Sequence, residues 1–378
     1  MDEDARDDAP ALLRLLASGV PPRVLRRLLD SHRSGRAVLA AGARDWASHG
    51  LDAGACNALR NPDAIALARG ERWLDAPRRH LIGWCQLDYP PLLRRIPSPP
   101  SMLFVDGDAA LLWRPAVAIV GSRTATPGGC SNAATFAAAL SQAGLCVASG
   151  LAAGIDAAAH LATLEAQGAT VAVLGTGPDI AYPVRHRPLL DHVASHGAVV
   201  SEHLPGTGPL RQHFPSRNRI LAGLSIGCVV IEAAERSGAL ITARLAAEVG
   251  REVFALPGSI HNPMARGCHR LIREGATLVE SPAEVLDVLA PLAVDLARAL
   301  RGELNASPDE LPGFLPLPLP EGKDYNRLWQ VLGHDPTGMD ELSQRSGLTV
   351  AELSAMLLAL ELDGRIAAEH GRYSRIGV

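Results

Sequence analysis

The sequence predicts an α/β protein with a doubly wound parallel sheet, preceded by a small helical domain and followed by a winged-helix domain. Between residues 116 and 256, short runs of Val, Ile, Leu and Ala lack apolar/polar alternation, which is typical of strands buried on both faces. Segments of helical length, such as 126–144 and 154–168, separate these runs, so strand and helix alternate through about six units. Turns that bear Gly or Arg follow nearly every run, and such turns predict an anion site beyond the carboxyl ends of the strands.

The first part of the chain is helical in pattern. Residues 9–75 include LLRLLASGVPPRVLRRLLD, which predicts a helix, a Gly/Pro turn and a second helix. The turn SGVPP weakly resembles a helix-hairpin-helix that offers backbone amides to phosphate, but Pro21 stands where a second glycine is usual. Both DNA contact and plain packing stay open for this turn, and we assign residues 1–78 to a helical domain.

The central α/β domain is expected to span residues 79–292. Its Pro-rich entry, residues 87–108, contains the run SMLFV, which predicts an extra strand. The segment GCHRLIREGATLVE and the helical pattern SPAEVLDVLA close the domain. About 200 residues is a normal size for one α/β domain.

The composition changes after this domain. Residues 293–322 are expected to form a linker, because prolines recur there without helical or strand periodicity. Residues 323–378 predict three helices and a hairpin, in the order of a winged helix, with Thr349 and Glu352 capping the third helix and Gly364 ending it. That helix carries Glu352, Glu361 and Asp363 but no basic residue before position 365, which favours protein contact over duplex reading.

Composition limits the class of protein. The chain has 378 residues, 47% of them hydrophobic, and a net charge of −4, which predicts a globular protein on which any basic surface is local. Neither a membrane span of about 18 uncharged apolar residues nor a basic, apolar leader is present, so we expect a cytoplasmic protein without membrane contact. Six cysteines without a CxxC pair predict buried core side chains and no metal site.

Glycine-rich turns after the first two predicted strands supply the first candidate ligand residues. In GSR, Gly121 permits a tight turn, Ser122 offers a hydroxyl and Arg123 offers a fork of donors to a phosphate. In SGLAAGID, the candidates are Ser149, Gly150, Gly154 and Asp156, of which Asp156 either caps the following helix or contacts the ligand. A complete GxGxxG and an acidic residue after LCVAS are both missing, so a dinucleotide cofactor is not expected.

Two further segments combine basic and aromatic side chains. FPSRNRI places Phe214 just before a predicted helix that begins with Arg217, Asn218 and Arg219. YPVRHR places Arg185 and Arg187 shortly after the run TVAVLGTG. An aromatic ring beside guanidinium groups suits single-stranded nucleic acid, through base stacking and phosphate pairing; a core phenylalanine with solvated arginines is the alternative.

An enzymatic function has weaker support. His160 is expected to be a packing residue rather than a base. Glu202 and Glu232 end predicted strands at the ligand edge, where nucleoside-monophosphate phosphoribohydrolases carry a catalytic glutamate. The PGGxGT loop of those enzymes is missing, although LPGS at 256–259 is a partial match. This hydrolase and a duplex-binding winged-helix regulator remain the alternatives.

Several long motifs closely resemble the DprA (Smf, DNA-processing protein A) family: GSR, SGLAAGID, GTGPDIAYP, FPSRNRILAGLS, EAAERSGALITARLAAEVGREVFALPGS and GCHRLIREGATLV. The resemblance covers about residues 80–290 and implies an extended Rossmann-like domain that binds single-stranded DNA, forms a homodimer and loads RecA recombinase during natural transformation. It implies no catalytic activity and no cofactor.

The same resemblance assigns roles to residues. Arg123, Arg217, Asn218 and Arg219 are then the phosphate contacts. Ser122, Gly150 and Phe214 shape the pocket, and Arg185 or Arg187 adds charge. The segment around His269 and Leu278 resembles the family's dimer and RecA-facing surface.

Overall fold

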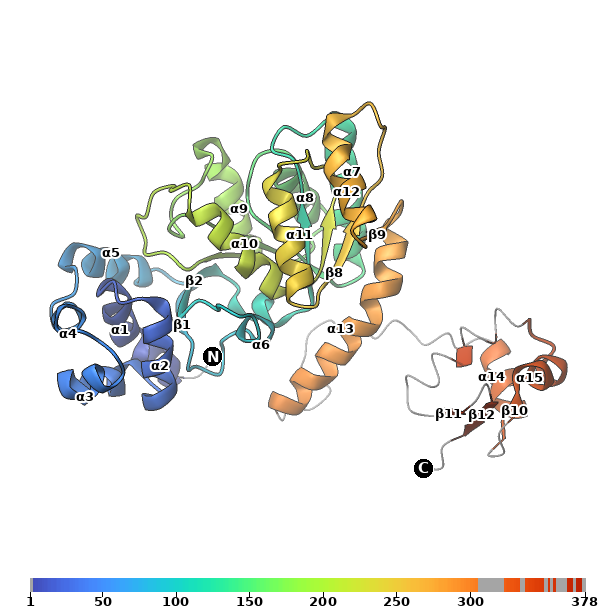
Figure 1. Ribbon diagram of the computed structural model, residues 1–378, viewed down its shortest axis with the longest axis horizontal. Coiled ribbons are helices and arrows are strands. Elements are labelled where there is room, and N and C mark those ends of the chain that lie inside the picture. Colours follow the sequence, from blue (N-terminus) through green and yellow to red (C-terminus); the bar gives the residue numbers. More distant parts are fainter. Residues whose placement is uncertain are drawn as a thin grey trace. The chain divides into compact units, whose positions relative to one another are not determined.

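The computed structural model describes residues 3–304, 323–333, 337–349, 353, 356–357, 366–369 and 372–375. The chain divides into two compact units, residues 1–312 and 313–378. A nine-stranded sheet organises the first unit (Figure 1), in the order β1-β2-β6-β5-β4-β3-β7-β8-β9. Its strands are β1 (Arg79–Gly83), β2 (Met102–Gly107), β3 (Ala116–Val120), β4 (Cys146–Ser149), β5 (Thr170–Val173), β6 (Ala198–Ser201), β7 (Ser225–Val230), β8 (Glu252–Ala255) and β9 (Thr277–Leu278).

The sheet is mostly parallel, as predicted. Every neighbouring pair from β6 to β9 is parallel. All residues of β3 and β7 are buried, which explains their unbroken apolar sequence. The chain adds β4, β5 and β6 on one side of β3 and then returns to add β7 on the other. This reversal places a topological switch point between β3 and β7, where ligands of such sheets bind.

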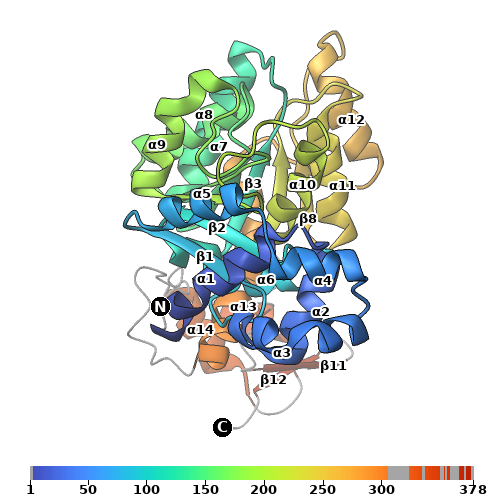
Figure 2. The same cartoon turned by 90° about the vertical axis from the view of Figure 1, so that its left-hand side faces the viewer.

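Helices cover both faces of this sheet. Figure 2 shows α7, α8 and α9 on one face and α10, α11 and α12 on the other. The first group comprises α7 (Pro127–Gln142), α8 (Ile155–Glu165) and α9 (Arg187–His196), and the second α10 (His213–Leu224), α11 (Gly238–Glu248) and α12 (Arg266–Arg273). The short α6 (Pro91–Arg94) packs against α10. Cys146, Cys228 and Cys268 are buried as small core side chains between these layers.

The N-terminal helices are joined to the sheet by a common core. They are α1 (Glu3–Ala17), α2 (Pro22–His32), α3 (Gly35–Ser48), α4 (Ala53–Arg60) and α5 (Ala64–Leu74), and they lie beside β1 and β2 (Figure 1). Leu12 and Trp73 share one buried cluster with Leu81 of β1 and Phe104 of β2. The rings of Trp73 and Phe104 meet edge to face with centroids 5.5 Å apart. The structure therefore differs from the prediction of a separate helical domain at 1–78.

Two antiparallel strands close this end of the sheet. The predicted strand SMLFV corresponds to β2, which runs antiparallel to β6. The sequence analysis missed its partner β1, which pairs with β2 in the register Leu81 to Phe104. β2 is buried on both faces, because Phe104 lies in the helical core and Leu103 and Val105 lie in the main core of the sheet, which explains its apolar run LFV.

Helix α13 (Pro282–Leu304) extends further than the sequence indicated. The linker was expected to begin at residue 293. In the structure the helix continues past Pro291 and includes residues 293–304. Val285, Leu289 and Ala293 are buried at helical spacing, so packing against the rest of the first unit stabilises α13 at least as far as Ala293. The linker prolines lie outside the described residues. No helix in the described residues is both long and apolar enough to cross a membrane.

The second unit has the helix and wing order predicted for it. It contains α14 (Lys323–Val331), β10 (Thr337–Gly338), α15 (Met339–Ser346), β11 (Ile366–Glu369) and β12 (Arg372–Arg375), with strand order β10-β12-β11. Leu328, Leu342 and Leu353 are among the buried residues that form its core. The Leu353 N–H donates to the Thr349 carbonyl at 2.9 Å. Glu352, Glu361, Asp363 and Gly364 lie outside the described residues.

Candidate nucleic-acid interface

The predicted ligand motifs meet at the carboxyl ends of the strands around the switch point. The turn after β3 carries Arg123, and the turn after β4 begins at Gly150. The two turns touch, because the Ile155 N–H donates to the Ser122 carbonyl at 3.2 Å. From the opposite face of the sheet, α10 brings Phe214 beneath Arg123, whose Cζ lies 5.5 Å from the ring centroid.

Glycine is required in these turns for steric reasons. Gly154 has φ +78°, and a Cβ there would lie 2.2 Å from the Ser122 carbonyl oxygen. A Cβ on Gly150 would lie 2.2 Å from the Arg217 guanidinium. A Cβ on Gly121 would meet Ile155 at 2.5 Å. These three glycines therefore let two turns and one buried arginine pack together.

Ser122 and Ser149, the two serines of these turns, form hydrogen bonds with backbone groups of the protein. Ser149 is fully buried, and its hydroxyl donates to the Ile119 carbonyl at 2.7 Å. Ser122 is buried as well, and its Oγ accepts the Thr124 N–H at 3.1 Å. Their hydroxyls hold the backbone at the ends of β3 and β4.

Asp156 braces the second turn from within α8. Its Oδ2 accepts the N–H groups of Gly150 at 3.1 Å and Ala152 at 3.3 Å, upstream of the helix. Burial raises the pKa of this carboxyl, and Arg217 and the two N–H groups oppose that shift. The sequence left open whether Asp156 caps the helix or contacts the ligand. The contacts of its carboxylate are structural, and they stabilise the turn after β4 rather than cap α8.

Arg217 and Asn218 lie beneath the surface, contrary to their expected position as phosphate contacts. Only 5% of Arg217 and 8% of Asn218 is exposed. The Arg217 guanidinium donates to the Val173 carbonyl and to Asn218 Oδ1. The FPSRNRI segment forms the first turns of α10, so that Phe214 is inside the helix rather than just before it. The Arg217 side chain consequently faces β5 of the sheet, and the Asn218 Nδ2 donates to the Gly238 carbonyl at the start of α11 at 3.5 Å.

Arg219 forms an ion pair with Glu202. Its Nη2 lies 2.5 Å from Glu202 Oε2, in a pair whose side chains are 20% and 10% exposed. The Ser216 hydroxyl also donates to Glu202, at 3.2 Å. Arg219 is thus paired inside the protein through Nη2.

Four side chains remain available at this edge, and we call them the aromatic–arginine cluster: Arg123, Tyr182, Arg185 and Phe214. The Tyr182 and Phe214 ring centroids are 5.1 Å apart, and 42% of Tyr182 is exposed. Arg123 and Arg185 are exposed, and neither has an acidic partner among the described residues. By contrast, Arg187 is paired with Asp191 at 3.0 Å, which raises its pKa. Arg185 is therefore the more available of the two arginines that the sequence left open.

The sequence analysis missed Tyr182 as a member of this cluster. Its signal was the first position of YPVRHR, the segment from which the sequence analysis took only the arginines. An exposed tyrosine beside a phenylalanine and a guanidinium offers π-faces to more than one base.

The groups considered for catalysis are all engaged in internal contacts. Glu232 is buried and accepts the Thr126 N–H at 2.9 Å and the Thr126 hydroxyl at 2.7 Å, at the start of α7. Glu202 is bound to Arg219. His160 is fully buried, with Nδ1 2.7 Å from Thr170 Oγ1, and burial lowers its pKa to about 3. None of these three groups presents a free base at the ligand edge.

His269 and Leu278 lie at the opposite side of the sheet from β1. His269 is on α12, with Nε2 3.0 Å from the Gly258 carbonyl oxygen. Leu278 ends β9, the last strand in the sheet order, and 45% of it is exposed.

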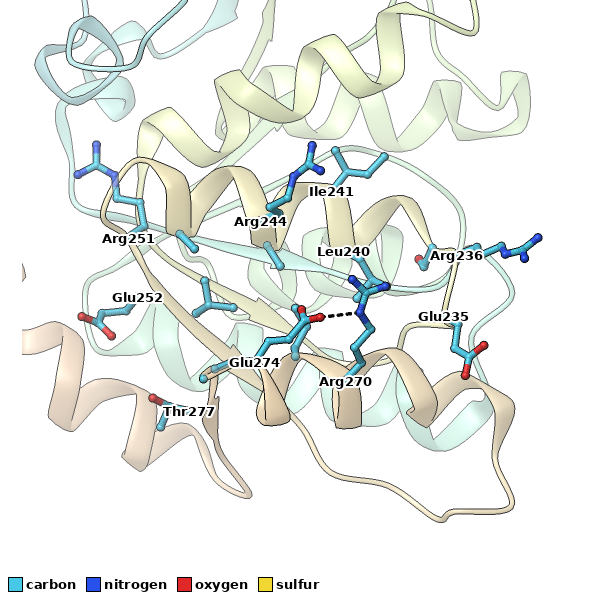
Figure 3. Close-up of a pocket in the computed structure, with 17 residues that line it drawn as sticks. Glu235, Arg236, Leu240, Ile241, Arg244, Arg251, Glu252, Arg270, Glu274 and Thr277 are labelled. Carbon is cyan, nitrogen blue, oxygen red and sulfur yellow. Dashed lines mark hydrogen bonds and ion pairs between the residues drawn. The ribbon is translucent and has the colours of Figure 1, made fainter.

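A groove of about 610 Å³ adjoins this segment, between α11 and α12 and along β8. Figure 3 shows its charged residues around the apolar floor, with Arg244 on α11 and the Arg270–Glu274 ion pair on α12. Leu240, Ala243 and Leu271 contribute to that floor. An apolar centre with charges of both signs around it is the usual composition of a protein-binding surface.

Comparison with known proteins identifies the relatives of this chain. Residues 80–290 match the family model of DNA recombination-mediator protein A, and residues 314–372 match the DprA winged helix domain. Protein Smf of Escherichia coli K12 is 42% identical over 305 residues, 80% of this chain and 79% of that protein. The DNA processing protein DprA of Streptococcus pneumoniae R6 is 48% identical over 198 residues, 52% of this chain and 70% of that protein.

Two solved structures have the same fold. The X-ray structure of DNA processing protein A from Streptococcus pneumoniae aligns with a TM-score of 0.64 and 38% identity, over 73% of this chain and 96% of that chain. DNA processing protein A from Helicobacter pylori, whose structure concerns its single-stranded DNA binding mode, aligns with a TM-score of 0.50 and 28% identity, over 53% and 92% of the two chains.

Proposed function

Because the chain belongs to the DNA recombination-mediator protein A (DprA/Smf) family, we propose that it processes DNA by binding single strands at the aromatic–arginine cluster. The observation that carries this proposal is the placement of Arg123 over Phe214 at the switch point, beside the exposed ring of Tyr182. A relative whose solved structure concerns single-stranded DNA binding supports it.

The chemistry of the cluster suits an unpaired strand. Tyr182 and Phe214 can stack on bases, which a duplex keeps inside its own stack. Arg123 and Arg185 can pair with phosphates, since no acidic side chain among the described residues neutralises them. Neither kind of contact reads base identity, so binding is expected to be independent of sequence.

Glu202 is paired with Arg219, and Glu232 accepts two hydrogen bonds from Thr126. These internal contacts favour a non-enzymatic role. Incubation with nucleoside monophosphates should therefore release no free base. Steady release that depends on either glutamate would instead establish a hydrolase.

The proposed binding is tested by fluorescence anisotropy of a labelled single-stranded oligonucleotide across a salt series. Arg123→Ala removes one phosphate contact, so affinity should fall and the slope of log Kd against log salt should decrease by about 0.7. Arg298→Ala is the matched control, since Arg298 is a surface arginine paired with Asp295 on α13. Equal effects of the two substitutions, or salt-independent binding, would contradict the proposed site.

We also propose that the protein forms a homodimer and hands DNA to RecA recombinase during transformation, through the surface around His269 and Leu278. The exposed Leu278 on the last strand of the sheet and the adjoining groove support a protein interface at this place. Leu278→Arg should shift the sedimentation coefficient from dimer to monomer, whereas Leu161→Arg, at an exposed leucine on α8, should not. Retention of the dimer in Leu278→Arg would move the interface elsewhere.

The RecA step has its own readout. Arg244→Glu reverses a charge at the groove without touching the aromatic–arginine cluster. It should reduce RecA-dependent strand exchange on protein-coated DNA while the affinity for single strands stays unchanged. Loss of both activities together would indicate misfolding or a shared site.

A further inference from the structure

Three side chains with metal-ligating atoms converge in the N-terminal helical segment, far in sequence from the DNA-binding motifs. His32 Nε2 lies 2.8 Å from Asp45 Oδ2, and His49 Nδ1 lies 3.5 Å from the same oxygen. The three ligand atoms are all within 4.8 Å of one another. His49 Nδ1 also lies 3.0 Å from the Asp45 main-chain carbonyl oxygen, a contact that a bound ion would replace.

Local structure explains how the three residues meet. Helix α2 ends at His32 because Arg33 adopts a left-handed conformation with φ 64°, and Ser34 then caps α3 by accepting the Ala37 N–H. Within α3, Gly42 has φ 79° and ψ 175°, which breaks the helical path and redirects the residues that follow. Asp45 and His49 come after this break and face the end of α2.

One buried and one exposed contact hold the ligand positions. Trp46, next to Asp45, is 3% exposed, and its Nε1 donates to the Val38 carbonyl at 2.7 Å across the break. His49 Nε2 lies 3.0 Å from Ser31 Oγ. With His49 Nδ1 as the ligand atom, its Nε2–H donates to this hydroxyl, the kind of contact that fixes the orientation of metal-binding histidines.

The separations match those of a small tetrahedral ion. Zinc binds nitrogen and carboxylate oxygen at about 2.0–2.2 Å, so that tetrahedral ligand atoms are about 3.3 Å apart. The separations from Asp45 Oδ2 to His32 Nε2 and to His49 Nδ1, 2.8 and 3.5 Å, lie on either side of this value. The His32 and His49 ring centroids are 5.7 Å apart, close to the roughly 5 Å expected for two imidazoles on one ion.

We propose that His32, Asp45 and His49 form a binding site for a divalent transition-metal ion, with zinc as the ion that suits two imidazoles and one carboxylate. The side chains are 20%, 32% and 24% exposed, so water can reach the site and fill the fourth position. The bound ion ties the end of α2 to the end of α3. This use is structural and independent of DNA binding.

A competing metal contact must be removed before the test. His192 and His196 are exposed on α9 at i and i+4 spacing, with ring centroids 4.7 Å apart, and such a pair can chelate metals by itself. The experiment therefore uses full-length, tag-free protein carrying His192→Ala and His196→Ala as the background. The metal is stripped with a chelator before each titration.

Zinc affinity is measured by competition with a chromophoric chelator, and ligand geometry by the visible absorption of Co²⁺. The background protein should bind one equivalent and give the intense visible bands of tetrahedral cobalt. His32→Gln and His49→Gln should each weaken zinc binding at least tenfold and abolish those bands. Ser31→Ala should weaken binding by about tenfold, because only the orientation of His49 is lost.

Unchanged zinc affinity in His32→Gln and His49→Gln, or octahedral cobalt spectra in the background protein, would overturn the site. In that outcome the three residues form a hydrogen-bonded cluster only. Because both histidines are partly exposed, circular dichroism should show that both variants are folded. The metal-free background protein should also melt at a lower temperature than the zinc-loaded protein, and this difference should vanish in the two variants.

Discussion

The burial of Arg217 leads to a quantitative prediction about stability. Arg217→Met keeps a long side chain but removes the guanidinium that donates to the Val173 carbonyl and to Asn218. It also removes the nearest positive charge from the buried carboxylate of Asp156. Leaving the buried Val173 carbonyl and Asn218 amide oxygen without their donor costs about 1–3 kcal/mol, so the free energy of unfolding should fall by at least that amount.

Urea denaturation followed by tryptophan fluorescence measures this loss, and pH supplies an internal check. Burial already raises the folded-state pKa of Asp156, so its contribution to stability is fully present below its unfolded pKa and is lost as pH rises through the folded value. Without Arg217 the folded pKa rises further, so the destabilisation should be larger at pH 7 than at pH 4. Combining Arg217→Met with Asp156→Asn should cost less than the sum of the two substitutions.

A loss below about 1 kcal/mol, or one that is equal at both pH values, would refute this reasoning. It would mean that water reaches the guanidinium and that Arg217 is available to DNA after all. The DNA-binding assay separates the two cases. A buried Arg217 leaves the salt slope of a folded variant unchanged, whereas a phosphate contact lowers it as Arg123→Ala does.

Three further predictions concern single contacts. Phe214→Ala should weaken single-strand binding by about 1–3 kcal/mol in anisotropy titrations, and Tyr182→Ala by a similar amount, because each removes one stacking face. Burial lowers the folded pKa of His160 to about 3, so stability should be full above its unfolded value near 6.5 and fall as pH decreases from there; His160→Gln should flatten that fall in urea midpoints. Gly154→Ala places a Cβ 2.2 Å from a carbonyl at φ +78° and should cost about 1–3 kcal/mol by thermal melting, whereas Gly238→Ala meets nothing within 4 Å and should not destabilise.

The parallel strands could be predicted because their burial leaves a direct mark on the sequence. Strands covered on both faces are apolar at every position, and β3 and β7 are buried throughout. β1 left no such mark, because its first two residues are only half-buried and its pairing depends on β2, which is separated from it by the intervening α6 segment. Long-range pairing of this kind is not encoded in local periodicity.

The sequence predicted where the candidate site lies on the sheet, but not which side chains are exposed there. Motif order placed Arg123 and Phe214 at one edge, since parallel strands all end there. Whether an arginine faces solvent depends on its helical phase: Arg217 points toward the sheet and Arg219 toward Glu202. Neither the Arg187–Asp191 ion pair nor the contact between Tyr182 and Phe214 could be predicted from the sequence, because each of these side chains had many other possible partners.

The core that the N-terminal helices share with β1 and β2 also limits where the chain can be shortened without loss of solubility. A cut at residue 78, where the sequence suggests a border, would separate Leu12 and Trp73 from Leu81 and Phe104 and leave apolar surface on both fragments. A fragment that omits the helices would expose one side of β2, next to the parallel strands that carry the DNA-binding turns. Ile82 of β1 and Leu103 and Val105 of β2 belong at the same time to the main core of the sheet, and β2 pairs with β6. The two antiparallel strands therefore join both cores, and a shortened protein that keeps its solubility should retain the chain from the first helix through the sheet.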